Sequence, residues 1–173
     1  MFSAILPYLL FFNIINTHLY PIQKHEIISN YVTNCDSIPQ LNKLIVAYAE
    51  SKIGKKVDRG ECWDLAAEAL KSVNAKWDGA YVFGRLVNQK KECIFPGDVI
   101  QFEGVKTKYK KDNMVYTGQM LHHTAIIYQV ISDGNYKIAE QNTGGSKGKK
   151  VSIGDFDTKT VTKGKYMIYR PTL

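Results

Sequence analysis

Cys62 is a candidate nucleophile because of its place at the start of a predicted helix. The segment Gly60-Glu-Cys-Trp-Asp-Leu opens a stretch whose apolar residues recur at helical spacing, so the thiol falls in the first turn. Backbone N–H groups without helical partners and the positive end of the helix dipole stabilise a thiolate there, which is the nucleophilic form. The adjacent acids Glu61 and Asp64 act in the opposite sense, because like charge raises a thiol pKa. The alternative interpretation is a buried, inert structural cysteine.

A candidate base follows in a different kind of element. His122 and His123 begin an alternating stretch that is typical of a β-strand, so one imidazole can face the Cys62 helix while its neighbour faces away. Glu140 and Asn142, two residues apart at the end of the next predicted strand, are expected to share a face. A carboxylate or amide that accepts the imidazole Nδ1–H is the orienting group of a thiol–imidazole hydrolase. Ordinary polar strand ends are the alternative.

The elements that position these groups follow an α+β order, with helices first and a mainly antiparallel sheet second. Helical spacing of apolar residues predicts one helix between Ser37 and Gly54 and another from Gly60 to Val73. From Pro96 onward the period changes to two. The predicted strands, separated by glycine-containing turns, are Val99–Phe102, Thr124–Ile131, Tyr136–Glu140, Lys150–Ile153 and Tyr166–Tyr169. The stretch from Gly104 to Met120 is predicted to be a polar insertion between strands.

The chain of 173 residues is basic, with 23 Lys and Arg against 16 Asp and Glu and a formal net charge of +7. Its 45% hydrophobic content suits one globular domain and argues against disorder. The insertion contributes candidates for docking onto an anionic polymer or lipid headgroup surface, with a solvated loop face as the alternative. These candidates are Lys106, Lys108, Lys110 and Lys111. No base-stacking motif or metal-ligand spacing accompanies them, so we expect a monomer without nucleic-acid partner, metal or cofactor.

The N-terminus predicts export. The first charged residue is Lys24, and the apolar run before it has the length of a secretory h-region, which is shorter than a bilayer requires. We therefore predict a signal peptide at residues 1–22, one domain over residues 23–173 and a secreted protein. An apolar N-terminal element packed on the domain is the alternative.

Three cysteines carry further information about the compartment. In an oxidising environment Cys35 and Cys93 could pair and leave Cys62 as a free thiol. The sequence does not fix this pairing. An odd thiol in an exported protein is either reactive or well buried.

Four ordered motifs resemble those of the papain-like superfamily, in particular its circularly permuted branch with CHAP amidases and NlpC/P60 endopeptidases. They are Gly60-Glu-Cys-Trp-Asp-Leu, Pro96-Gly-Asp-Val-Ile-Gln-Phe, His123-Thr-Ala-Ile-Ile and Glu140-Gln-Asn. The residues of these motifs are most similar to those of the cysteine-proteinase-fold domain at the C-terminus of fungal actin-patch SH3 proteins that bind myosin tails. That similarity runs from about Leu41 to Pro171.

The resemblance implies roles for individual residues. Cys62 would be the nucleophile, His123 the general base, and Glu140 with Asn142 the orienting pair. CHAP enzymes commonly place Gln before the cysteine, where it can donate to the oxyanion. This chain has Glu there, and an ionised carboxylate cannot donate. The candidates to contact the substrate or the oxyanion are Glu61, Trp63, His122 and Gln141.

The expected function is a secreted thiol hydrolase that cleaves an amide bond in a peptide or a peptidoglycan-type substrate. It would act through a Cys-His-Glu/Asn site and an acyl-enzyme, and transfer of the acyl group to an amine is a variant of the same chemistry. The alternative is a catalytically silent interaction module with the cysteine-proteinase fold. Glu61 beside the thiol, and the resemblance to a domain of scaffold proteins, favour that alternative.

Overall fold

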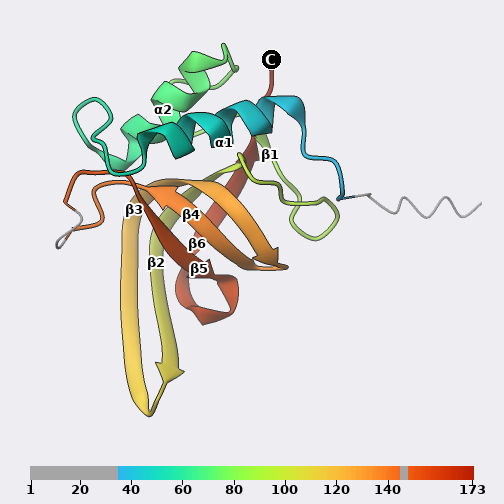
Figure 1. The fold of residues 1–173 in the computed structure, drawn as a ribbon. Coiled ribbons are helices and arrows are strands. Elements are labelled where there is room, and N and C mark those ends of the chain that lie inside the picture. Colours follow the sequence, from blue (N-terminus) through green and yellow to red (C-terminus); the bar gives the residue numbers. More distant parts are fainter. Residues whose placement is uncertain (1–34, 145–147) are drawn as a thin grey trace, which may run out of the picture. The chain divides into compact units, whose positions relative to one another are not determined.

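The computed structural model describes residues 35–144 and 148–173 (Figure 1). The predicted signal peptide at residues 1–22 lies outside them. Among the described residues, no helix is long and apolar enough to cross a membrane. The elements in chain order are α1 (Gln40–Lys52), α2 (Cys62–Ser72), β1 (Arg85–Leu86), β2 (Val99–Lys111), β3 (Met114–Ser132), β4 (Asn135–Glu140), β5 (Ser152–Asp157), the 3-10 turn η2 (Thr158–Thr160) and β6 (Val161–Arg170).

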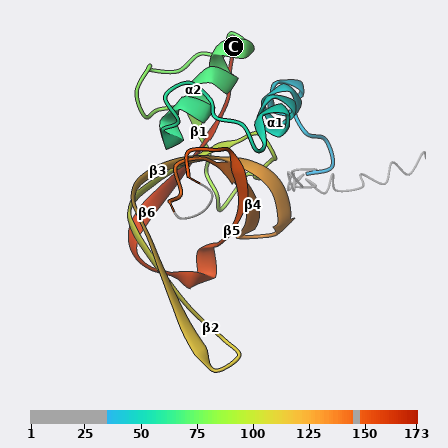
Figure 2. The ribbon, with the colours of Figure 1, turned by 60° about the vertical axis from the view of Figure 1, so that its left-hand side comes forward.

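The strands form one antiparallel sheet in the order β1-β6-β2-β3-β4-β5. The two helices lie on one face of this sheet, which curves strongly on its other side (Figures 1 and 2). The predicted α+β class is therefore confirmed. Alternation along β2 explains the two cores: Val99 packs with the helices, whereas Ile100 faces the concave side. Each fully buried aliphatic side chain of these cores contributes about 1.5–3 kcal/mol.

The Pro96-Gly-Asp motif is a structural junction between the helices and the sheet. Gly97 has a φ of +87°, and a Cβ there would lie 2.3 Å from the backbone oxygen of Asn42 on α1. The carboxylate of Asp98 is fully buried and accepts from the Asn42 amide at 2.8 Å and from the Arg170 guanidinium at 2.7 and 3.0 Å. One buried carboxylate thus ties α1, β2 and β6 together, which is the arrangement that makes a buried charge tolerable.

The segment from Gly104 to Met120 corrects a prediction. It is not an insertion between strands but the outer halves of β2 and β3, paired from Lys106 opposite Gln119 to Lys111 opposite Met114. We call residues 104–120 the β2–β3 arm. The arm extends beyond the other strands in both views (Figures 1 and 2). The apolar alternation that signals a strand is missing because neither face of most of the arm is buried.

A disulfide joins Cys35 to Cys93, with Cα atoms 5.7 Å apart. It ties the segment before α1 to the loop before β2 and closes a loop with a sequence separation of 58 residues. A cross-link of this span stabilises a fold by about 4 kcal/mol in the chain-entropy model. The pairing that the sequence left open is thus answered, and Cys62 is the free cysteine of the described residues.

Candidate active site

The start of α2 and the neighbouring strand β3 bring Cys62 and His123 together. Cys62 is the first residue of α2 and is half-buried. The His123 side chain and the backbone N–H groups of Thr124 and Trp63 lie close enough to its sulfur to lower the pKa of the thiol. The thiol therefore sits among hydrogen-bond donors, which stabilise its ionised form.

The carboxylate of Glu140, the last residue of β4, orients the imidazole from the opposite side. Nε2 of His123 lies 2.8 Å from Oε2 of Glu140, and both side chains are largely buried, with exposed fractions of 12% and 13%. This leaves Nδ1 as the ring nitrogen available to Cys62. The prediction that the orienting group accepts a hydrogen bond from Nδ1 of the imidazole is wrong, because Nε2 faces Glu140. The three side chains form the continuous series Cys62, His123, Glu140.

The electrostatics of the pair favour a thiolate and an imidazolium. Burial acts to raise the pKa of the Cys62 thiol, but the His123 hydrogen bond, the two backbone donors and the imidazolium charge together lower that pKa below its ordinary value. Burial likewise acts to lower the pKa of His123, but its hydrogen bonds to Cys62 and Glu140 raise that pKa to about 9. Both shifts favour placing the shared proton on His123.

The two acids beside the thiol are each engaged by a cation. The Glu61 carboxylate accepts from Lys149 Nζ at 2.5 Å and from the Asn142 amide at 2.7 Å. The Asp64 carboxylate is buried and accepts from the Arg59 guanidinium at 2.5 Å. These partners offset the opposing effect that the sequence predicts for both acids, and they show why a lowered thiol pKa is compatible with them.

Asn142 lies just past the end of β4 and lines one hollow together with His123 and Glu140. β4 ends at Glu140, and Asn142 has a φ of +61°, so the two-residue period no longer applies there. Its amide donates to Glu61 at the other side of the thiol. Of the predicted orienting pair, the described contacts to the His123 imidazole come from Glu140.

Gln141 has a different role from the predicted contact with the oxyanion. Its side chain is fully buried, and Nε2 donates to the backbone oxygens of Val57 at 3.1 Å and Glu61 at 2.7 Å. Its Oε1 accepts from the Val57 N–H at 3.2 Å. Both amide hydrogens are therefore used on the backbone, and Gln141 fixes the segment that leads into Cys62.

The remaining candidates line a hollow of about 540 Å³ beside the thiol. Trp63 donates its indole N–H to the Ala80 carbonyl at 2.5 Å, so this group is not directed at a substrate. His122 faces the same hollow, with Nδ1 2.9 Å from Glu103 and its ring centroid 4.3 Å from that of Tyr81. Tyr81 was not found from the sequence, because no motif surrounds it.

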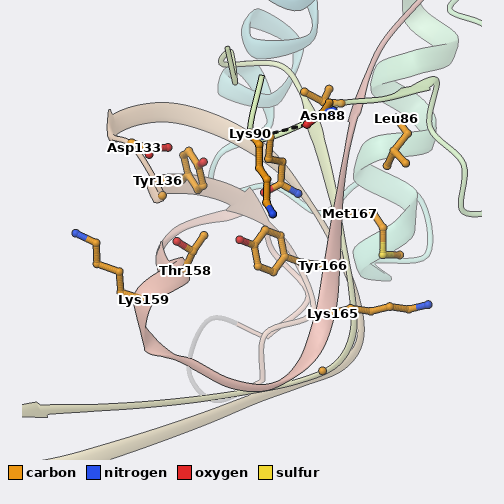
Figure 3. A pocket seen from close by; sticks show the side chains of 14 residues that line it. Leu86, Asn88, Lys90, Asp133, Tyr136, Thr158, Lys159, Lys165, Tyr166 and Met167 are labelled. Atoms are coloured by element: carbon orange, nitrogen blue, oxygen red, sulfur yellow. Dashed lines mark hydrogen bonds between the residues drawn. The ribbon is translucent and has the colours of Figure 1, made fainter. Parts of the chain in front are cut away.

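A larger hollow of about 720 Å³ lies elsewhere (Figure 3). Its side chains include Lys90, Tyr136, Tyr166 and Met167, and no cysteine or histidine lines it. It therefore lacks a thiol–imidazole pair. Among the described residues, no three His, Cys, Asp or Glu side chains converge as metal ligands.

A cysteine at a helix start, facing a histidine and a carboxylate on adjacent strands of an antiparallel sheet, defines a cysteine-proteinase-fold domain. Comparison with known families agrees with this class. The chain belongs to the AIM3/BBC1 cysteine proteinase-fold domain family, whose model matches residues 39–173. This confirms the resemblance seen in the sequence.

Two individual proteins are also similar. Altered inheritance of mitochondria protein 3 from Debaryomyces hansenii is 26% identical over 166 residues, which cover 83% of this chain but only 18% of that protein. The solved structure described as the crystal structure of Ly7917 is 12% identical, with a TM-score of 0.45, and the match covers 74% of this chain and 62% of that one. The latter likeness is too weak to bear on function.

Proposed function

We propose that this domain is a thiol hydrolase that cleaves an amide bond, in which Cys62 is the nucleophile. The observation that carries the proposal is the placement of Cys62, at the start of α2, beside an imidazole that Glu140 holds at 2.8 Å. The lowered pKa of the thiol and the raised pKa of His123 support it. A structural cysteine has no need of such an environment, whereas perturbed pairs of this kind cluster at catalytic sites.

In the proposed reaction the Cys62 thiolate attacks the carbonyl carbon of the amide. The C–N bond then breaks as the His123 imidazolium gives its proton to the leaving amine, and an acyl-enzyme forms. Neutral His123 next takes a proton from water, whose oxygen attacks the thioester. The C–S bond breaks, the carboxylic acid is released, and the Cys62 thiolate and His123 imidazolium are restored. Glu140 holds the imidazole in place and stabilises its charged form throughout.

Two groups are proposed as donors to the oxyanion of this reaction. The backbone N–H of Cys62 belongs to the first turn of α2, where N–H groups have no intrahelical acceptor. The Asn142 amide lines the same hollow as the thiol, and its nitrogen has a second hydrogen besides the one donated to Glu61. Asn142 then replaces the glutamine that would precede the cysteine in CHAP-type sites.

The proposed substrate is a peptide or a peptidoglycan-type stem, and the proposed location is extracellular. The disulfide between Cys35 and Cys93 supports an oxidising compartment. The hollow beside Cys62 is open and flanked by aromatic side chains, which suits an extended chain with apolar groups better than a small polar molecule.

A catalytically silent interaction module is the second candidate. It is favoured by membership of a family defined by its fold, in which the matched relative is much longer than this chain. The side-chain N–H groups of Gln141 and Trp63 donate to backbone carbonyls, which leaves few side-chain donors for an oxyanion.

The experiment that separates the candidates is a search for amide cleavage by the full chain. A panel of peptides and peptidoglycan fragments is incubated with the native chain, Cys62→Ala and Ser72→Ala, and the products are identified by mass spectrometry. We expect cleavage by the native chain and by Ser72→Ala, which changes the far end of α2, and a loss of at least about 1000-fold in Cys62→Ala. Native chain that cleaves nothing in the panel would favour the silent module.

A further inference from the structure

The β2–β3 arm is a two-stranded ribbon without a core of its own. Every residue from Lys108 to Gln119 is exposed, on both faces of the ribbon. β6 pairs with β2 only as far as Thr107, so the outer part of the arm has no third strand. Two-stranded ribbons are marginally stable in water, because they bury little apolar surface. The exposed surface of an arm of this length is therefore suited to binding a partner that covers it.

The end of the arm is apolar and aromatic. Met114 and Val115, beside the turn, are 56% and 57% exposed. One step further along, Tyr109 and Tyr116 face each other across the strands and stack, with ring centroids 5.1 Å apart. Large apolar side chains gathered at the end of a projecting hairpin are costly to leave in water.

The sides of the arm are strongly cationic. Its charged residues are four lysines, at 106, 108, 110 and 111, against the single acid Asp112 at the turn. Lys106 also lies opposite Lys163 of β6, and like charges that face each other across strands are destabilising. None of these lysines has an ion pair within the described residues. Their charge is thus available to an anionic partner.

We propose that the β2–β3 arm docks onto a bilayer that contains anionic phospholipids. Met114 and Val115 enter the boundary between headgroups and acyl chains, and the Tyr109–Tyr116 pair lies at headgroup level, where tyrosine is enriched in membrane proteins. The lysines contact anionic headgroups, with their aliphatic stems along the apolar layer. At the end of the ribbon each apolar side chain lies opposite a lysine, Met114 opposite Lys111 and Val115 opposite Lys110, so apolar insertion and headgroup contact would occur together at a membrane surface.

The exposed apolar side chains of Met114 and Val115 distinguish a bilayer from other anionic partners. A nucleic acid or an acidic polymer would use the lysines but would leave Met114 and Val115 in water. The inference does not depend on thiol chemistry, because the arm lies outside the contacts of Cys62. Its strand β3 is nevertheless continuous with His123, so docking would hold the candidate active site near the membrane surface.

The test measures co-sedimentation of the full chain with vesicles of phosphatidylcholine alone or mixed with phosphatidylserine. We expect binding only to the mixed vesicles. The variant with all four arm lysines changed to Gln should bind more weakly by about fivefold per lysine, on the order of several hundredfold in total. The matched control changes Lys43, Lys90, Lys91 and Lys159 to Gln, which removes the same charge elsewhere and should weaken binding much less. All variants retain residues 1–34, so differences between them report the arm.

A second variant tests insertion of the tip. Met114→Cys in a Cys62→Ser background carries an environment-sensitive dye, whose fluorescence should rise on mixed vesicles. Val115→Ser together with Met114→Ser should weaken binding by about tenfold or more, since it removes two apolar side chains from the interface. Equal losses for the arm and control lysine variants, or an unchanged dye signal, would overturn the proposal. Stronger binding to polyglutamate or DNA than to mixed vesicles would assign the arm to those polymers. Iodoacetamide labelling of Cys62 should be the same in the lysine variants as in the native chain.

Discussion

His123 presents Nε2 to Glu140 at 2.8 Å, which leaves Nδ1 for the Cys62 thiol, so a single imidazole lies between a thiol on a helix and a carboxylate on a strand. This relationship makes the two neighbours of His123 energetically unequal. Glu140 stabilises the charged form of His123 directly. Cys62 is in turn affected by that charge, because the imidazolium stabilises the thiolate. Substitutions of Glu140 should therefore act on Cys62 through the ring.

Glu140→Gln should lower the pKa of His123 by about one unit or more, because it removes the opposite charge that favours the imidazolium. The native pKa of about 9 sets the upper limit of the pH range in which the leaving amine can be protonated. If the domain cleaves amides, the falling limb of its pH–rate profile should move from about 9 to lower pH in Glu140→Gln. NMR titration of the His123 ring checks the same shift without a substrate. An unchanged His123 titration would contradict this role of Glu140.

Lys149→Gln should slow the alkylation of Cys62 at neutral pH by roughly threefold. The substitution removes the cation that offsets the Glu61 charge, so the nearby carboxylate raises the pKa of the thiol. The pair is solvent-exposed, which limits the effect. Lys150→Gln is the matched control, since it removes the same charge one residue away. Equal effects of the two substitutions would show that Lys149 acts only through net charge.

Gln141→Leu should reduce the free energy of unfolding by about 2–3 kcal/mol. It removes the three hydrogen bonds of a fully buried side chain and leaves the Val57 N–H without its partner. Urea denaturation measures the loss, and Gln129→Leu, on the exposed side of β3, should stay within about 0.5 kcal/mol of the native chain. The alkylation rate of Cys62 should fall in Gln141→Leu as well, because the segment that leads into the thiol is no longer held.

The double variant Cys35→Ala/Cys93→Ala should unfold at a lower temperature, with a loss of about 4 kcal/mol in stability if the chain-entropy account holds. Thermal unfolding followed by circular dichroism measures the change. Addition of a reducing agent should reproduce it in the native chain and have no effect on the double variant. Identical unfolding temperatures with and without the reductant in the native chain would show that the disulfide does not stabilise the fold.

The sequence predicts the elements that have a buried face and a regular period. The helix that begins at Cys62 and the inner part of β3 after His123 are examples, because apolar spacing is a direct consequence of packing on one side. The β2–β3 arm was missed for the same reason, since it has no buried face. Its Tyr109 and Tyr116 favour a strand, but no alternation of burial marks it.

The residues of the candidate site whose contacts were predicted wrongly lie in turns or bind residues that are far away along the chain. Asn142 has a positive φ beyond the end of β4, and its amide donates to Glu61, a contact that strand alternation does not predict. Gln141 and Lys149 find their partners more than 80 positions away in the chain, at Val57 and Glu61. No local sequence pattern predicts such contacts, so the roles of Gln141 and Lys149 can be seen only in the three-dimensional structure.

The most direct test of the central claim, a thiolate–imidazolium pair at Cys62 and His123, is the rate of Cys62 alkylation by iodoacetamide as a function of pH. The native chain should give a rate that rises through a pKa below the ordinary value for cysteine. His123→Gln should move that rise to higher pH and slow the reaction at neutral pH by about tenfold or more. Superimposable profiles for the native chain and His123→Gln would contradict the account.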